Sequence, residues 1–418
     1  MDAQFLSGKK IIIAGAGISG LAFTLAIRQL WPAVLEPPYI VIYERDSDAV
    51  PPGREGYSLS LAGFDETGGL YAARDLGILD EVLNHATQGL GNQFVFKVWN
   101  NSWNELLSMK FKPAAGLPTA GIRIARKNLR KVLTTAVGSG QIKWNTACVD
   151  AEKLPNGKMM VTLSGDHIPA DKSTTECDLL IVADGAASKI RSKLRPDDTL
   201  QYAGVMQKGG LAVFPNVIPQ PVDKNWGMLL SSGKGMACFL SPYDETSVAW
   251  GMSYRAPTIE EPLKLSGLED AQKVIDECKE LGKEFPEPFQ SILDATDPRD
   301  VSRLAARDKQ PFSHDLSLGP VIFIGDSNHA VSPFSGYGAS LALKDGWDLS
   351  MQLCKAKSLA EAVKAYDAIS VPRANKVLKE SHQRIDMGHA TGLNYLVNRS
   401  LLGIGGFVLA VKEAISFS

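Results

Sequence analysis

Two glycine-rich turns, far apart in the chain, have the residue types that bind a phosphate or another small anion. The first, Gly15-Ala16-Gly17-Ile18-Ser19-Gly20, follows the apolar residues 11–14 and precedes a run with helical periodicity. The second lies in residues 321–340, where an apolar run ends at Gly325-Asp326 and a Gly336-Tyr337-Gly338 turn opens another helical run. Such turns present unpaired backbone N–H groups and the positive end of a helix dipole. Alone, the second stretch could equally be a buried strand with a polar exit loop, and the first turn is what favours a nucleotide site.

The three glycines of the first turn have separate mechanical roles. Gly15 allows a tight turn, Gly17 lets the backbone approach a pyrophosphate, and Gly20 lets the helix pack closely on the strand. The next predicted strand, residues 39–43, ends at Glu44, where a carboxylate binds ribose hydroxyls. This carboxylate favours a free 2′-hydroxyl, as in FAD or NAD, over the 2′-phosphate of NADP. The residues themselves do not choose between FAD and NAD.

Two further positions could contact the same nucleotide. Arg126 stands in the first turn of a helix predicted over residues 124–133, where a cation is unfavourable unless an anion lies nearby. It belongs to a basic cluster that includes Arg123 and Arg130, and such a cluster is most often a solvated helix face with at most one anion contact. Asp184-Gly185 follows a predicted strand and joins it to a helix through another glycine turn.

These positions require a parallel α/β fold, but the pattern changes in the middle of the chain. Residues 246–254 alternate, with Val248, Trp250, Met252 and Tyr254 on one face, which predicts a half-buried antiparallel strand. Residues 70–84 have the pattern of one helix. The sequence predicts a nucleotide-binding domain in two parts, residues 1–199 and 301–356, with an antiparallel-sheet domain over 200–300 between them. Strands near 90–112 could join this second domain. Residues 357–418 are predicted to form C-terminal helices.

The composition excludes several classes of function. A net charge of −2 argues against a nucleic-acid partner, because phosphate backbones require a basic surface. Five cysteines without CxxC spacing and six histidines without HxxxH or HExxH spacing predict no metal site and no disulfide framework.

The two ends of the chain predict a cytoplasmic protein. The first strand begins near Ile11, which leaves no room for a signal peptide. The apolar residues 401–411 are shorter than the roughly 20 residues of a membrane span, and we expect a packed helix there, with membrane contact as the minor alternative. The oligomeric state is not predicted.

Three motifs in this order resemble the group A flavoprotein monooxygenases, which have the p-hydroxybenzoate hydroxylase fold. They are the first glycine turn with Glu44, the Asp184-Gly185 motif, and residues 325–338 with the pattern Gly-Asp-x-x-His-x-x-x-Pro-x-x-Gly-x-Gly. Within the family the chain is similar to single-component enzymes related to tetracycline-inactivating monooxygenases and to fungal tailoring hydroxylases. The resemblance implies an α/β fold: a Rossmann-like FAD-binding domain with an inserted antiparallel-sheet substrate domain and a C-terminal helical segment.

The resemblance also assigns FAD contacts to a set of residues: Gly15, Gly17, Gly20, Glu44, Arg45, Arg54, Gly56, Arg126, Asp184, Asp326, Pro333, Gly336, Gly338 and Ala339. It implies that Asp326 and Arg126 bind the ribityl or pyrophosphate part, and that the Asp184 motif serves both FAD and NAD(P)H. It further implies that the Gly-x-Gly turn places N–H groups at the pyrimidine edge of the flavin, where the reduced ring carries negative charge. Ser340 stands where the family often has asparagine.

The implied reaction consumes NADPH or NADH and O₂. By the resemblance, the nicotinamide reduces FAD, O₂ forms a C4a-hydroperoxide, and its distal oxygen passes to an aromatic or polycyclic hydrophobic substrate. No catalytic side chain is required, although Tyr202, Tyr254 and His329 are candidates, each with a structural role as the alternative. The substrate pocket is expected between the flavin and the inserted sheet. Its candidate residues, for which plain core packing is the alternative, are Met228, Phe239, Trp250, Met252 and Phe334.

Other functions fit parts of the same sequence. Epoxidation or Baeyer–Villiger oxidation would use the same motifs. An NAD-dependent dehydrogenase would keep the region from Gly15 to Glu44 but has no use for Gly325-Asp326, and a nucleotide-binding protein without catalysis predicts no turnover. A flavin halogenase is disfavoured because its Trp-x-Trp-x-Ile-Pro signature is absent, and Trp99 and Trp103 have the wrong spacing.

Overall fold

A computed structural model describes residues 3–48, 58–87, 95–169 and 173–416, with side chains as far as residue 405. The solid apolar runs of the sequence form a five-stranded parallel sheet in the order β17-β11-β1-β2-β7. Runs of this kind form central strands because both faces of a parallel sheet are covered. The strands are β1 Lys10–Ala14, β2 Tyr39–Tyr43, β7 Ile142–Lys143, β11 Leu179–Val182 and β17 Val321–Phe323.

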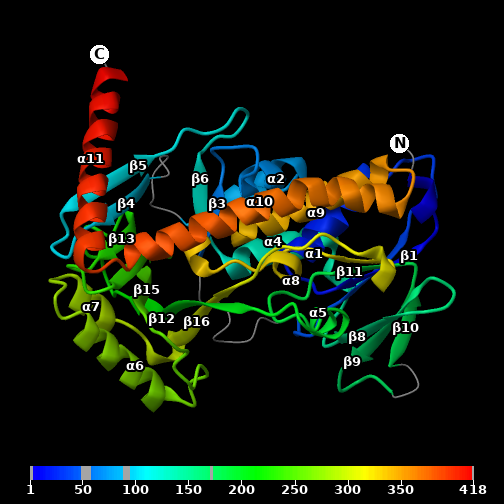
Figure 1. Ribbon diagram of the computed structural model, residues 1–418, viewed down its shortest axis with the longest axis horizontal. Coiled ribbons are helices and arrows are strands. Elements are labelled where there is room, and N and C mark those ends of the chain that lie inside the picture. Colours follow the sequence, from blue (N-terminus) through cyan, green and yellow to red (C-terminus); the bar gives the residue numbers. More distant parts are fainter. Residues whose placement is uncertain (1–2, 49–57, 88–94, 170–172, 417–418) are drawn as a thin grey trace.

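Different layers cover the two faces of this sheet. Ile11 and Ile13 pack with helices on one face, while Ile12 and Val182 pack against a three-stranded antiparallel sheet on the other. The helices on the first face are α1 Ile18–Leu30, α2 Gly69–Asp75, α3 Leu79–Asn84, α4 Arg126–Val137, α9 Gly338–Lys355 and α10 Leu359–Gly388. The small sheet on the second face consists of β8 Ala147–Lys153, β9 Met159–Ser164 and β10 Thr174–Cys177, and α5 Lys189–Leu194 packs against it. Figure 1 shows these layers.

Two predicted helices differ in detail from the structure. Residues 70–84 form two helices rather than one, because Gly77 adopts φ +71° between α2 and α3. The helix predicted from residue 124 begins at Arg126, since the residues before it form β6 Gly121–Ala125, which pairs with β3 Ser58–Ala62. Arg126 therefore occupies the first helical position, as predicted.

A seven-stranded sheet forms the second large unit, in the order β16-β12-β15-β14-β13-β4-β5. All neighbouring strands are antiparallel except β13 and β4. Its strands are β4 Val95–Trp99, β5 Glu105–Lys110, β12 Gln201–Val213, β13 Trp226–Leu230, β14 Met236–Pro242, β15 Ser247–Arg255 and β16 Ser302–Asp308. The fold class is thus confirmed. Strands from residues 95–110 and 302–308 belong to this sheet, and the division of the chain into domains stays a prediction.

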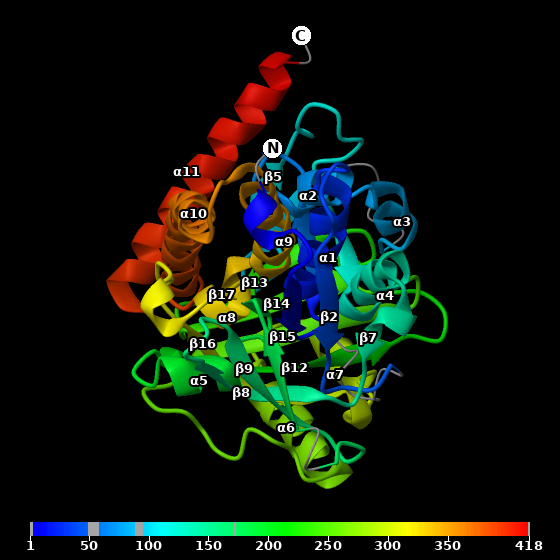
Figure 2. The ribbon, with the colours of Figure 1, turned by 90° about the vertical axis from the view of Figure 1, so that its right-hand side faces the viewer.

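Helices cover the seven-stranded sheet on one face and continue the chain beyond it. On the covered face lie α6 Leu268–Leu281 and α7 Phe289–Asp294. The last helix, α11 Gly392–Ser416, projects from the body of the molecule in both views (Figures 1 and 2). Leu402 packs against the sheet, and among the residues whose side chains are described the helix is packed along one side only. One side stays open to solvent, with 54–80% exposure at Leu393, Leu396, Val397, Leu401 and Ile404. Within the described residues, none of the helices has the length and apolar character that crossing a bilayer requires.

Candidate active site

The first glycine turn forms an open anion site at the start of α1. Gly15 adopts φ +109°, and a Cβ atom there would lie 2.4 Å from the carbonyl oxygen of Ala183. A Cβ atom at Gly20 would lie 2.3 Å from the carbonyl oxygen of Gly15. At Gly17 the nearest atom would be 3.7 Å away, so this glycine borders open space rather than protein. No side chain of the described residues caps α1. The turn therefore fits a pyrophosphate, and the three contacts stay predictions.

Glu44 is fixed to this turn at the end of β2. One carboxylate oxygen accepts a hydrogen bond from the backbone N–H of Ala16 at 2.7 Å, and the other accepts one from Asp46 at 2.9 Å. Arg130 lies 4.0 Å from the same carboxylate, and its Nη2 atom is buried without a hydrogen-bond acceptor. Arg45 is largely exposed beside Asp46. The predicted ribose ligand is thus held rigidly next to the phosphate turn.

Asp326 lies at the start of α8 Asp326–His329 with its carboxylate exposed to solvent. Gly325 before it adopts φ +59°, and a Cβ atom there would lie 2.8 Å from Ser19 Oγ, so the second motif packs against the first. Desolvation by the surrounding protein raises the pKa of Asp326, while electrostatic interactions with His329 and Arg126 oppose this rise. The structure therefore brings Asp326 and Arg126 together.

Arg191 joins the Asp184 motif to the Asp326 motif. Its Nη1 donates to the carbonyl oxygen of Ser327 at 2.9 Å, and its Nη2 donates to that of Ala186 at 2.5 Å. Asp184 accepts a hydrogen bond from the backbone of Lys189 at 3.0 Å, and its other carboxylate oxygen is buried without a partner. Burial raises the pKa of Asp184. The two predicted motifs are thus linked through the buried side chain of Arg191.

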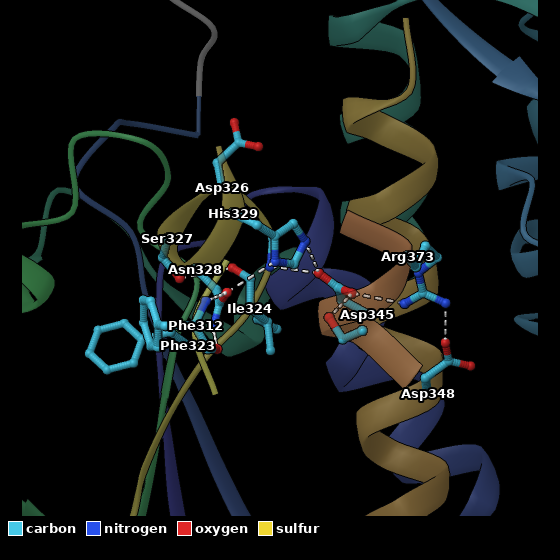
Figure 3. A network of polar contacts seen from close by, with 12 residues as sticks. Phe312, Phe323, Ile324, Asp326, Ser327, Asn328, His329, Asp345, Asp348 and Arg373 are labelled. Atoms are coloured by element: carbon cyan, nitrogen blue, oxygen red, sulfur yellow. Dashed lines mark hydrogen bonds and ion pairs between the residues drawn. The ribbon is translucent and has the colours of Figure 1, made fainter. Parts of the chain in front are cut away.

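A buried charge network supports the Asp326 loop from below (Figure 3). His329 Nε2 lies 2.8 Å from Asp345 of α9 without good hydrogen-bond alignment, and the backbone N–H of Gly325 donates to the same carboxylate at 2.8 Å. Arg373 of α10 then bridges Asp345 at 3.0 Å and Asp348 at 2.6 Å. Burial alone would raise the pKa of Asp345, but the facing cations and the Gly325 N–H outweigh it and hold that pKa well below its usual range. Asp326 itself points away from this network. Because His329 is buried against Asp345, the geometry favours a structural role for it over that of a base.

The Gly-x-Gly turn leaves the start of α9 uncapped by any described side chain. Gly336 adopts φ +65° and is exposed, and Tyr337 is half-buried as the N-cap residue. Ser340 is fully buried, its hydroxyl has no hydrogen-bond partner, and a Cβ atom at Gly69 of α2 would lie 2.9 Å from it. The Ser340 hydroxyl therefore faces α2 rather than open space. The backbone of this turn remains available, with Pro333 exposed, Gly338 half-buried and Ala339 buried. Arg54 and Gly56 lie outside the described residues.

The predicted pocket residues divide between the two faces of the seven-stranded sheet. Met228 and Phe239 are half-buried on the face toward the FAD-binding unit. Trp250 and Met252 lie on the opposite face, where they pack in the core beneath α6 and α7, and the Trp250 indole donates to Thr296 at 2.8 Å. For these two residues the structure favours the alternative of core packing.

The two candidate tyrosines have protein partners. Tyr202 donates to the carbonyl oxygen of Ala256 at 3.1 Å, and Tyr254 donates to Glu260 at 2.5 Å. Burial and then Glu260 raise the pKa of Tyr254 well above its usual range, which disfavours it as a base. Tyr254 also borders a surface cavity of about 610 Å³ beside α6, on the face away from Phe239. The geometry thus supports a structural role for both hydroxyls.

Phe334 contacts the sheet through His389, which is buried at the end of α10. The two rings meet edge to face at 5.4 Å, and His389 places Nδ1 2.8 Å from the carbonyl oxygen of Ile385 and Nε2 2.8 Å from Ser253 Oγ. Burial lowers the pKa of His389 to about 4, against an opposing effect of the Ile385 carbonyl. This histidine is therefore neutral in the folded protein at neutral pH.

Acidification is expected to destabilise the fold through His389. An unfolded histidine takes up a proton near pH 6.5, whereas the folded one resists until about pH 4. The stability that the folded protein gains by keeping His389 neutral is therefore fully present above pH 6.5. It is lost as the pH falls toward 4, by up to about 3 kcal/mol. Urea unfolding at pH 7 and pH 5 should show a smaller pH dependence in His389→Gln than in the wild type. An equal dependence in both proteins would assign the effect to other groups.

Several residues at this site were not predicted from the sequence. Asp345 is an acid on the apolar stripe of α9, and such an acid signals a buried partner. Arg191 follows the Asp184-Gly185 motif closely in the sequence, but nothing in this spacing indicates that its side chain binds the carbonyl oxygens of Ser327 and Ala186. Arg373 and His389 belong to a long helix with no distinguishing pattern.

Comparison with known proteins agrees with this geometry. A family described as an FAD binding domain matches residues 54–381. Monooxygenase cfoF from Aspergillus candidus is 40% identical over 396 residues, which cover 94% of each chain. Zeaxanthin epoxidase from Solanum lycopersicum is 28% identical over 92% of this chain but only 53% of its own length.

The fold also matches a solved structure. Klebsiella pneumoniae HpxO, complexed with FAD and uric acid, superposes with a TM-score of 0.75 at 20% sequence identity, covering 96% of this chain and 95% of that one. The predicted resemblance is thus confirmed by the family match, the relative at 40% identity and the shared fold. The chain belongs to the family of FAD-dependent monooxygenases.

Proposed function

We propose that this monooxygenase acts as a single component, consumes NAD(P)H and O₂, and hydroxylates an aromatic or polycyclic hydrophobic small molecule. The observation that carries the proposal is a continuous series of aromatic contacts, the aromatic lining, between the cofactor turn and the sheet. Tyr337 at the start of α9 contacts Phe64 edge to face at 6.2 Å, and Phe64 stacks on Phe111 at 4.6 Å. Phe64 belongs to the same apolar cluster as Phe239 and Trp226 of the sheet. A planar hydrophobic substrate fits against such a lining.

The chain's own residues bind and orient the cofactor. When bound, FAD supplies the redox chemistry, which is reduction by the nicotinamide and activation of O₂. The Gly17 turn and Arg126 fit its phosphates, Glu44 fits the ribose, and Asp326 fits the polar linker between phosphate and ring. The uncapped start of α9 offers N–H groups and a positive dipole end, which favour negative charge on a bound ring.

Three measurements on the purified protein test this function. We expect bound FAD, NAD(P)H oxidation coupled to O₂ uptake, and a product that is heavier by one oxygen when aromatic polyketides, indoles and terpenoids are screened. Asp326→Ala should lose most of its FAD and its turnover while its circular dichroism stays unchanged. A wild-type protein that binds no added FAD, or that never transfers oxygen to any compound of these classes, would contradict the proposal.

Epoxidation is the second candidate, and one observation favours it. The zeaxanthin epoxidase relatives are 25–28% identical to nearly all of this chain. The two reactions add the same mass, so the products must be separated by chemical behaviour. An epoxide opens to a diol in mild acid, whereas a ring hydroxyl does not, and a substrate with an isolated alkene would favour epoxidation.

A further inference from the structure

Arg123 of β6 is a buried cation, and no carboxylate of the described residues forms an ion pair with it. The residue is 5% exposed, and its three hydrogen bonds go to neutral oxygens. Nη1 donates to Ser60 Oγ at 2.6 Å, Nη2 to the carbonyl oxygen of Ser58 at 3.0 Å, and Nε to Ser241 Oγ at 3.3 Å. Arg373, by contrast, is buried between two carboxylates. A cation withdrawn from water without an opposite charge destabilises a fold, so such a residue is retained for another reason.

The guanidinium bridges the two units of the molecule on the face of the seven-stranded sheet that carries Phe239. Ser60 belongs to β3 beside the cofactor region, and Ser241 belongs to β14 of the seven-stranded sheet. The guanidinium carbon also lies 5.1 Å from the ring centre of Phe239 and 5.4 Å from that of Trp226. Aromatic faces attract a cation but do not neutralise it. Burial therefore lowers the pKa of Arg123 to about 9, which leaves the group charged at neutral pH.

The surroundings of Arg123 still have unused hydrogen-bonding capacity. A guanidinium has five N–H groups, and three of them have the partners named above, which leaves two. The hydroxyl of Ser58 is buried beside it without a hydrogen-bond partner. Both groups lie at one end of the aromatic lining whose other end is Tyr337 at the cofactor turn. These donors suit an acceptor oxygen that carries negative charge.

We propose that Arg123 is a specificity-determining residue, which binds an ionised oxygen of the substrate, either a phenolate or enolate or a carboxylate. The inference rests on the function proposed above. Arg123 then holds the substrate through its charge, and Phe239 and Trp226 hold the adjacent ring. If the oxygen is a phenolate, its ionisation also raises the electron density of the ring, which favours attack on an electrophilic oxygen.

The test uses three probes of similar shape with the FAD-loaded protein in the absence of NAD(P)H. They are 4-nitrophenol, 4-nitrobenzoate and 4-nitroanisole, which offer a phenolate, a carboxylate and no charge. Binding is followed by flavin fluorescence, and the ionisation of 4-nitrophenol by its visible absorption. We expect the wild type to prefer at least one anionic probe over 4-nitroanisole. If that probe is 4-nitrophenol, it should ionise at lower pH when bound, and if it is 4-nitrobenzoate, the recognised oxygen is a carboxylate.

Substitution separates a ligand-binding role from a structural one. Arg123→Met should lower the affinity for the preferred anionic probe by roughly tenfold to a hundredfold, the loss expected when a hydrogen bond to a charged group is removed. It should leave 4-nitroanisole unchanged and should not lower the melting temperature, because the desolvated charge is gone. Arg123→Lys should retain part of the anion preference. Arg299→Met, at an exposed arginine that pairs with Asp297, is the matched control. It should change neither the binding of the three probes nor the melting temperature.

Two results would overturn the proposal. One is a wild type with no preference for an anionic probe, and this readout remains even if Arg123→Met does not fold. The other is an Arg123→Met protein that binds all three probes as before or loses all three equally. Because binding is measured without turnover, an enzyme that fails to transfer oxygen would reject the proposed function but would leave this result interpretable.

Discussion

Asp345→Ala is expected to cost about 3–5 kcal/mol of folding free energy, the range for breaking a buried ion pair. The Asp345 carboxylate meets His329 at 2.8 Å, Arg373 at 3.0 Å and the backbone N–H of Gly325 at 2.8 Å, and it is fully buried. Its removal leaves the buried backbone N–H of Gly325 without an acceptor. It also leaves the buried basic side chains of His329 and Arg373 with less negative charge beside them. The Asp326 loop rests on these groups, so bound FAD should be lost as well.

Urea unfolding of the flavin-free protein, together with flavin content after purification, would measure both effects. Asp386→Ala is the matched control, because Asp386 forms an exposed ion pair with Arg255 at 2.5 Å and should cost at most about 1 kcal/mol. The pH dependence has a defined sign. Since the folded pKa of Asp345 is depressed, its contribution is present above about pH 4 and is lost as the pH falls further. Equal stability of the two variants would contradict the role given to the network.

Two glycine substitutions in the first turn should have different consequences, one for folding stability and the other for FAD binding. Gly20→Ala places a Cβ atom 2.3 Å from the backbone oxygen of Gly15 and 3.1 Å from Ile13. The strand and helix cannot separate without opening the core, so a loss of about 3 kcal/mol or an insoluble protein is expected. Gly17→Ala meets nothing closer than 3.7 Å, so the protein should fold normally but should bind FAD much more weakly.

Thermal unfolding of the flavin-free forms and titration with FAD would separate the two cases. The comparison is informative because both changes add the same methyl group within one turn. Full FAD affinity in Gly17→Ala would show that the cofactor does not approach this part of the backbone. A stable Gly20→Ala protein would show that the contact between β1 and α1 is looser than the structure indicates.

The parallel sheet was predicted well because its signals are local. Residues 10–14 and 39–43 form strands at the predicted positions, since a short β-branched run with a glycine turn has few other stable conformations. The motif at Gly325-Asp326 was located for the same reason. The helix over residues 70–84 was divided at Gly77, where a left-handed conformation ends one helix before the other begins.

The orientation of side chains on the inserted sheet was not predictable in the same way. Alternation correctly grouped Trp250 with Met252, but a period of two does not show which face meets the cofactor unit. Arg123 was grouped with a basic helix face, yet the strand β6 ends just after it and turns its side chain inward. The network around Asp345 depends on Arg373 of another helix, a pairing that only the tertiary structure reveals.

The parallel pairing of β4 with β13 has a consequence for how the protein is made. Residues 95–99 leave the ribosome early, but their partner in the sheet is residues 226–230. At roughly 5–20 residues per second, the hairpin of β4 and β5 waits on the order of ten seconds with an unpaired edge. The parallel sheet is likewise incomplete until β17 emerges. The nascent chain therefore cannot complete its cofactor unit first, and strand edges stay unpaired until most of the protein has been synthesised.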